Sequence, residues 1–269
     1  MNQIFNRQSF VAASFLLVMV FSANLMSANA QNNQTLFGVT TGNQLAQFNA
    51  ATPGTLITIG QVTGLQPGEN ILGIDFRPAT GELFGLGSSS RLYNINRTTG
   101  AATAVGPQFP TLLTGTNFGF DFNLTVDRIR VVSDSGQNLR LNPSNGAVVV
   151  DGDLNPGTPR VTAAAYTNSF GVAATTTLYD IDTVTDWLLI QSNPNVGTLT
   201  NVGSLGVDFD PVNGFDIASN ALSPRNDAVA APAVLDPEFP KIVRQALGAF
   251  YGITIAITPA PRNDLVRMN

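Results

Sequence analysis

The sequence predicts an all-β protein, a β-propeller of about five four-stranded blades of which the last is incomplete. The tetrapeptide Gly-x-Asp-Phe occurs three times, at 73–76, 119–122 and 206–209. A degraded copy, Ala163-Ala164-Ala165-Tyr166, lies about halfway between the last two. The resulting period of roughly 44 residues is typical of one propeller blade. A β-sandwich is the alternative fold.

Residues 1–30 are predicted to be a signal peptide. Arg7 precedes the uncharged apolar run 10–21, and Ala28-Asn29-Ala30 forms a cleavage site before Gln31. The apolar run is shorter than the roughly 20 residues that a membrane-spanning helix needs. We therefore expect a secreted or periplasmic chain that begins at Gln31 and has no membrane span after cleavage.

Residues 31–219 are predicted to form the propeller-like domain, because short apolar segments alternate with Gly, Pro, Asn and Thr. Four consecutive segments joined by hairpin turns make one antiparallel sheet. Such sheets bury both faces when they pack radially around an axis. The expected strands of three successive repeats are 72–76, 82–86, 91–96 and 101–105; 118–122, 128–133, 137–142 and 146–150; and 161–166, 177–182, 187–191 and 197–202.

The two ends of the repeat array are irregular. The first repeat lacks its opening strand, which a propeller commonly borrows from its C-terminus, and the fifth unit is expected to begin at Gly206. The repeat pattern stops after Ser219. Residues 220–269 are therefore predicted to be a divergent tail, with a short helix over 240–250 and no closing strand. This tail is either a different C-terminal element or a replaced or frameshifted end.

Composition excludes several kinds of site. The 269 residues contain no histidine and no cysteine, which excludes Ser-His-Asp and Cys-His centres, His-ligated metals and disulfides. Charged residues make up 12% and the net charge is −5. A nucleic-acid or anionic-membrane partner needs a basic face, so neither is expected.

Several motifs resemble those of a family of exported bacterial proteins known only as domain of unknown function 4394. The residues that carry the resemblance are Gly73–Gly81, Asp127–Ser133, Gly136–Pro143, Ala164–Asn168 and Thr176–Asp182. It covers about residues 36–219 and implies a propeller-like domain without assigned catalytic residues. Members of that family usually continue past Gly214-Phe215-Asp216-Ile217 with further strands, and this chain departs from the pattern there.

The repeated acids Asp75, Asp121 and Asp208 are the candidate metal ligands. If the blades superpose, the three carboxylates form one tier that is able to hold a cation such as Ca²⁺. The simpler interpretation, which repetition in every blade favours, is that each carboxylate accepts backbone N–H bonds in its own blade. The pairs Asp151/Asp153, Asp180/Asp182 and Asp208/Asp210 also offer oxygens, but none has the EF-hand register.

Arg130 occupies the position that Phe84 has in the preceding repeat. A buried arginine needs a carboxylate partner, and Asp121 or Asp75 is the expected one, in an ion pair between blades. The alternative is a ligand-binding surface for an anion or a carbohydrate. That surface would comprise Arg128, Arg130, Gln137, Asn138 and Arg140. Trp187, the only tryptophan, is expected to pack in the core rather than to stack on a sugar.

These observations favour a non-catalytic binding or scaffold module for a small molecule, a glycan or a protein, without a cofactor other than Ca²⁺. One alternative is an enzyme that uses Asp and Arg on a glycan or small molecule. An unneutralised axial cluster of Asp and Arg would favour the enzyme, whereas complete Asp–Arg pairing between blades would favour the scaffold. A truncated or frameshifted chain with impaired folding is the third possibility; it predicts unpaired edge strands in the first and last repeats.

Overall fold

The computed structural model describes residues 35–49, 52–169, 173–206, 208–211, 214–220, 223–231 and 253–257. Within these ranges the protein consists of β-strands and connecting turns, without a helix. None of the described residues belongs to a helix of the length and apolar character that crossing a membrane requires. The predicted signal peptide and the helix expected over 240–250 lie outside the described residues.

The strands form four four-stranded sheets and one two-stranded sheet, and all pairings between neighbouring strands are antiparallel. The first sheet contains β18 (Ile253–Ile257), β1 (Thr35–Thr40), β2 (Gln44–Asn49) and β3 (Thr52–Gln61). The second contains β4 (Ile71–Phe76), β5 (Leu83–Gly87), β6 (Arg91–Ile95) and β7 (Ala102–Ala104). The third contains β8 (Phe118–Asn123), β9 (Arg128–Ser133), β10 (Asn138–Leu141) and β11 (Val148–Val150). The fourth contains β12 (Val161–Tyr166), β13 (Leu178–Asp182), β14 (Trp187–Asn193) and β15 (Thr198–Ser204), and the fifth β16 (Gly214–Asn220) and β17 (Ser223–Ala231).

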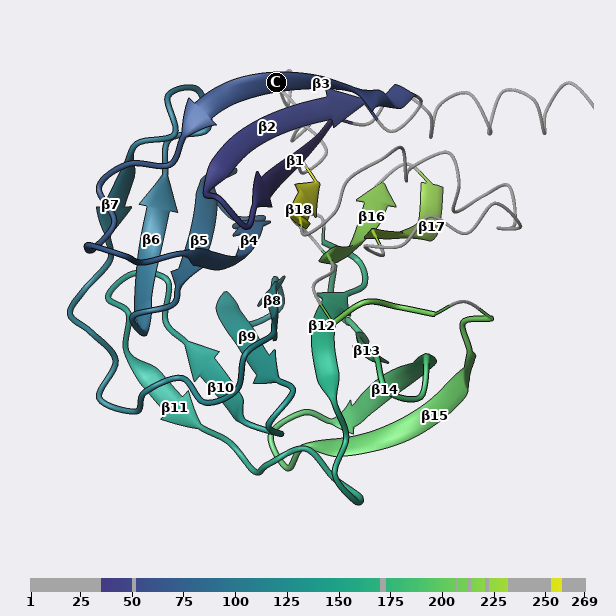
Figure 1. The fold of residues 1–269 in the computed structure, drawn as a ribbon. Helices are drawn as coiled ribbons and strands as arrows, with labels where there is room; N and C mark the ends of the chain where they lie inside the picture. Colours follow the sequence, from purple (N-terminus) through teal and green to yellow (C-terminus); the bar gives the residue numbers. More distant parts are fainter. Residues whose placement is uncertain are drawn as a thin grey trace, which may run out of the picture.

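The sheets are arranged around a common centre, and one edge strand of each lies closest to it (Figure 1). These inner strands contact one another in the order β18, β4, β8, β12 and β16, and β16 in turn contacts β18. The strands expected between residues 72 and 202 are present, and their bounds differ from the expected ones by at most two residues.

The core lies between successive sheets. Phe37 of the first sheet packs edge-on against Phe76 of the second, with ring centroids 5.4 Å apart. Phe84 of the second sheet packs likewise on Phe122 of the third, at 5.3 Å. Similar apolar clusters lie between the third and fourth sheets and between the fourth and fifth. A two-layer sandwich has a single such interface, so this series of interfaces does not match the alternative fold.

The glycine of the repeated motif is explained by close contact between inner strands. A Cβ atom on Gly73 would lie 2.5 Å from Cβ of Phe120, and one on Gly119 would lie 2.6 Å from the backbone N of Ala164. Carbon atoms pack at about 3.5–4.0 Å, so neither position has room for a side chain. The motif therefore combines a close approach at Gly with an apolar contact at Phe.

Two expectations about the C-terminal part were wrong. The fifth unit begins at Gly214 rather than Gly206, and Asp208 is exposed outside any strand. A closing strand does exist: β18 pairs with β1, with Gly38 opposite Ile255, and supplies the strand that the first repeat lacks. The sequence prediction missed it because β18 is a run of five residues without the repeat motif. Whether residue 220 marks a domain boundary stays a prediction.

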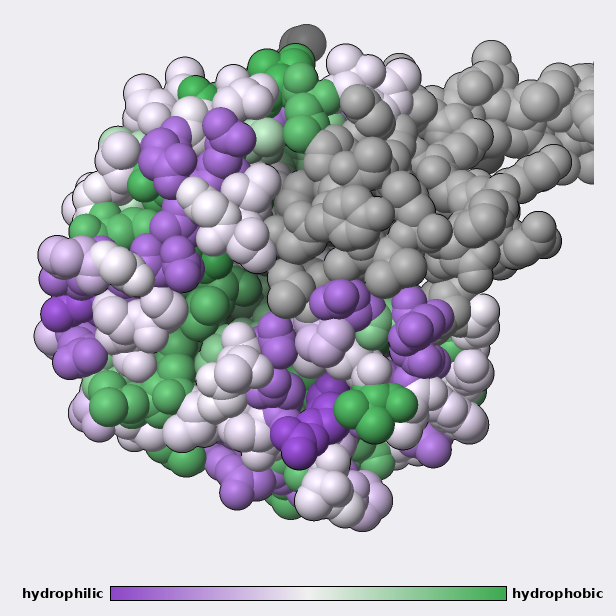
Figure 2. Space-filling model, in the orientation of Figure 1, coloured by the Kyte–Doolittle hydropathy of each residue, from purple (hydrophilic) through white to green (hydrophobic). Residues whose placement is uncertain are grey.

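The surface reflects the low content of charged residues. Figure 2 shows hydrophilic and hydrophobic residues intermingled on one face, with many residues of intermediate hydropathy between them. Several apolar side chains are exposed singly, among them Val126, Val184 and Val202. Scattered exposed apolar residues are normal in soluble proteins and do not mark a site by themselves.

Candidate functional site

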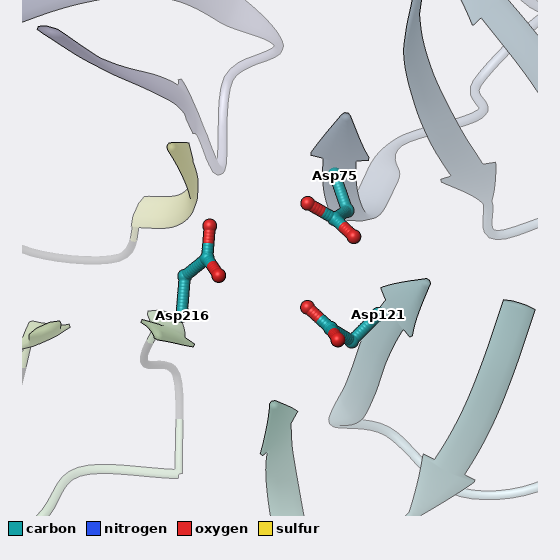
Figure 3. Close-up of side chains that lie close together, drawn as sticks. All are labelled: Asp75, Asp121 and Asp216. Atoms are coloured by element: carbon teal, nitrogen blue, oxygen red, sulfur yellow. The ribbon is translucent and has the colours of Figure 1, made fainter. Parts of the chain in front are cut away.

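Three aspartates from three different sheets meet near the centre of the molecule. Asp75 lies on β4, Asp121 on β8 and Asp216 on β16, and their side chains point toward one another (Figure 3). Each offers one oxygen to a group in which all oxygens lie within 4.8 Å of one another. All three residues are buried. We call these three residues the axial cluster.

The carboxylates of the axial cluster also bind backbone N–H groups of the inner strands. Oδ1 of Asp75 accepts the N–H of Phe76 at 2.6 Å, and Oδ2 accepts that of Phe122, in the neighbouring sheet, at 2.8 Å. Asp121 accepts the N–H of Tyr166, again one sheet further, at 2.8 Å. Inner strands are sheet edges, so these N–H groups would otherwise lack an acceptor. The aspartates therefore join adjacent sheets.

Burial raises the pKa of Asp75 and of Asp121 well above the usual range. Repulsion from Asp216 raises the pKa of Asp75 further, and repulsion from both other acids raises that of Asp121. In the described part of the chain no arginine or lysine is paired with Asp75 or Asp121. The cluster is therefore suited to hold shared protons or to coordinate a cation through oxygen.

Of the predicted metal set, the structure brings Asp75 and Asp121 together, but the third member of the cluster differs, and a metal role stays a prediction. Asp208 is exposed and lies apart from the axial cluster, where Asp216 takes its place. The segment Gly214-Phe215-Asp216-Ile217 has the same Gly-x-Asp-apolar pattern as the earlier copies, which is the signal that could have identified it. In the fourth sheet Ala165 stands at the equivalent position, directly before Tyr166.

Arg130 is the centre of a second polar group, which lies between the third and fourth sheets. Its side chain is 2% exposed and donates to Asp151 at 2.6 Å, to Asn138 at 2.7 Å and to Asn195 at 3.1 Å. Arg140 binds the same Asp151 carboxylate through two hydrogen bonds, of 2.6 and 2.9 Å. One buried carboxylate thus forms ion pairs with two arginines.

The prediction that Arg130 pairs with Asp121 or Asp75 was wrong. Arg130 pairs with Asp151 instead of Asp121 or Asp75, although Asp121 lies directly opposite it in the β8–β9 register. Asp121 points to the centre, where it binds the N–H of Tyr166, whereas the longer arginine side chain extends to Asp151.

The predicted ligand-binding set is divided by the structure. Asn138 and Arg140 join Arg130 around Asp151. Gln137 instead binds the backbone of Leu112 and Thr114, and Arg128 donates to the carbonyl of Asp127. All five side chains thus use hydrogen-bonding groups within the protein, and a ligand role for them stays a prediction.

Asp180, which the sequence offered only as one of a pair of acids with Asp182, is buried. Neither of its carboxyl oxygens has a hydrogen-bond partner among the described residues, and the same holds for Oε1 of buried Gln191. Burial raises the pKa of Asp180 to about 8, although the positive charge of Arg130 acts in the opposite direction. Asp180 is therefore predominantly protonated at neutral pH.

The chain matches a family model over residues 44–240, most of its length. That model is described as a domain of unknown function, DUF4394. The chain belongs to this family. The match confirms the resemblance and extends beyond residue 219, where it was expected to end. No curated protein sequence matches the chain.

Similar solved structures share little sequence with this DUF4394 protein. A structural genomics protein of unknown function from Bacteroides thetaiotaomicron VPI-5482 superposes with a TM-score of 0.49 and 14% identity, over 68% of this chain and 51% of that chain. An auxiliary nutrient binding protein from Bacteroides ovatus ATCC 8483 gives 0.44 and 13%, over 70% and 50%. A chain of a nidogen/laminin complex gives 0.49 and 14%, over 85% and 100%. This chain spans about half the length of the two Bacteroides structures, and these similarities assign it no function.

Proposed function

We propose that this DUF4394 protein is a five-bladed propeller that acts outside the cytoplasm as a non-catalytic binding or scaffold module. The circular order of contacts among the inner strands supports five blades, and β18 supplies the opening strand of the first. The predicted signal peptide supports the location.

The axial cluster consists of aspartates, and no described arginine pairs with Asp75 or Asp121, so it meets neither of the two sequence criteria. The observation that supports the non-catalytic role is which groups the acids and arginines bind. Asp75 and Asp121 accept backbone N–H bonds from neighbouring sheets, and the described arginine ion pairs go to Asp127 and Asp151. An enzyme based on Asp and Arg needs an acid and a base that reach a substrate. Asp151 and Arg130 are instead buried against each other, with exposures of 5% and 2%.

Cation binding at the axial cluster is a second candidate function. The specific observation that favours it is the convergence of three buried carboxylates within 4.8 Å. Calcium takes six to eight oxygen ligands, so carbonyl or water oxygens would have to complete the shell.

A thermal melt of the chain from Gln31 onward, in calcium and then in EDTA, tests these proposals. A single cooperative transition at the same temperature in both supports a metal-free module. A midpoint that rises with calcium, and no longer does so in Asp121→Asn, supports the cation site. The absence of a cooperative transition supports the third possibility, a chain with impaired folding.

A further inference from the structure

A groove of about 660 Å³ opens between the fourth sheet and the segment that precedes it. The strands β14 and β15 form one wall, and Pro156, Thr158 and Pro159 form the other. Small-molecule sites usually measure about 300–1,000 Å³, so the groove is large enough for a specific ligand. It lies outside both the axial cluster and the Arg130 group.

The groove contains the only tryptophan of the chain. Trp187 packs in part against the apolar cluster between the third and fourth sheets, as the sequence predicts, but it remains partly exposed where it lines the groove. Leu189 and Leu199 are buried beneath it. An aromatic ring fixed from one side and open on the other is a platform for an apolar ligand face.

Neutral polar groups surround this platform. Among the described residues, the side chains of Thr158, Thr185 and Asn201 and the indole N–H of Trp187 have no hydrogen-bond partner. Hydroxyl and amide groups both donate and accept, which suits a ligand that carries many hydroxyls.

The charges of the groove disfavour an ionic ligand. Asp182 is the only charged residue that lines it, and its oxygens already accept the backbone N–H groups of Arg160, Val184 and Thr185. The net charge of −5 works against an anion as well. A ligand with an apolar face, several hydroxyls and no charge matches all of these features.

We infer that the groove binds a neutral glycan, one sugar ring of which stacks on Trp187 while its hydroxyls bond to Thr158, Thr185 and Asn201. This inference rests on the proposed function, because it names the ligand class of the binding module.

The test uses the fluorescence of Trp187, which reports on this site alone because no other tryptophan is present. The chain from Gln31 onward is titrated with cellotetraose, maltotetraose, xylotetraose and chitotetraose. We expect a saturable change in emission with at least one of them. No saturable change with any of the four, in a protein that melts cooperatively, overturns the inference and leaves the module itself in place.

Variants then locate the site by calorimetry. Trp187→Ala should weaken binding at least tenfold, Trp187→Phe should weaken it less, and Asn201→Ala should weaken it several-fold. Val202→Ala is the matched control, because this exposed neighbour on β15 is not among the residues that line the groove. Unchanged binding by Trp187→Ala overturns the inference. Chromatography of the glycan after incubation shows whether the protein hydrolyses it. Hydrolysis would contradict the non-catalytic role but not the binding of a glycan in the groove.

Discussion

At the scale of single residues, the buried polar groups between the third and fourth sheets have the largest consequences. Arg130 is among the largest fully buried side chains of the described residues, and each of its three nitrogens donates to a protein group. A buried ion pair adds little net stability, but removal of one partner leaves the others desolvated and unpaired.

We expect Arg130→Met to lower the free energy of unfolding by about 3–5 kcal/mol, because Asn138 and Asn195 lose their donor and Asp151 keeps only Arg140. Urea unfolding followed by circular dichroism measures this loss. Arg128→Met is the control, and its effect should stay below about 0.5 kcal/mol because Arg128 is partly exposed and binds only backbone carbonyls. A loss of unfolding free energy for Arg130→Met that is as small as the loss expected for Arg128→Met would show that the buried network does not stabilise the protein.

Asp180 should make the protein less stable as the pH rises. Its pKa is about 8 in the folded protein and near 3.8 in the unfolded chain. Between these two pH values the carboxyl group is therefore protonated in the folded state and ionised in the unfolded state. Stability therefore falls from about pH 4 to pH 8, by up to about 1.4 kcal/mol per pKa unit. Asp180→Asn cannot ionise, so it should reduce the difference in unfolding free energy between pH 5 and pH 8.

The control for this pH profile is Asp153→Asn, because Asp153 is exposed. Its profile should follow that of the unmodified protein. The axial cluster contributes a fall of its own, so only a fall in Asp180→Asn as steep as that of the unmodified protein would show that Asp180 does not contribute.

At the scale of strands, the repeat motif predicted most of the fold because each of its residues has one physical task. Gly119 allows close approach, Asp121 accepts an N–H from the next sheet, and Phe122 fills the core. Strands 72–202 could be located from this pattern together with the turn residues. The partner of Arg130 could not, because the register places two acids within reach of one flexible side chain.

The last sheet shows why a short motif is an incomplete guide. The segment 206–209 matches the motif letter for letter, but its described residues Gly206, Asp208 and Phe209 lie outside the strands. Gly214-Phe215-Asp216-Ile217 ends in Ile instead of Phe and lies in the inner strand β16. Ile and Phe are equivalent for burial, so physical character predicts this position better than residue identity. Asp216 was therefore missed from the candidate site.

Gly119→Ala tests whether close packing of the inner strands is needed. A Cβ atom there would lie 2.6–2.8 Å from backbone atoms of Ala163 and Ala164, which cannot move without displacing β12. We expect a loss of about 1–3 kcal/mol in unfolding free energy, measured by chemical denaturation. Gly203→Ala is the control, because no atom lies within 4 Å of the position that its Cβ would occupy. Equal stability of the two variants would contradict the role of the motif glycine.

At the scale of the whole molecule, the carboxyl groups of the axial cluster both bind protons and connect adjacent sheets through hydrogen bonds. The pKa values of Asp75 and Asp121 are raised by burial and by neighbouring acids, so the folded protein binds protons that the unfolded chain releases above about pH 4. The molecule should therefore be more stable at pH 5 than at pH 8 in EDTA.

We expect Asp121→Asn to reduce this difference, since the amide oxygen still accepts the N–H of Tyr166 while one negative charge is removed. Thermal melts at both pH values in EDTA measure the effect, with the exposed Asp208→Asn as the control. A variant that is less stable than the unmodified protein at pH 8, in EDTA as well as in calcium, would show that the charge itself holds the sheets together.

The pairing of β18 with β1 also determines when the molecule can finish folding. Gly38 pairs with Ile255, so the first sheet stays open until the residues of β18 have been synthesised. Contacts between residues so distant in sequence form late, and an open strand edge can pair with other chains in the meantime. If the chain crosses a membrane N-terminus first, as the predicted signal peptide implies, each copy passes through an interval in which its edge strand β1 is unpaired and other chains or a chaperone can bind it.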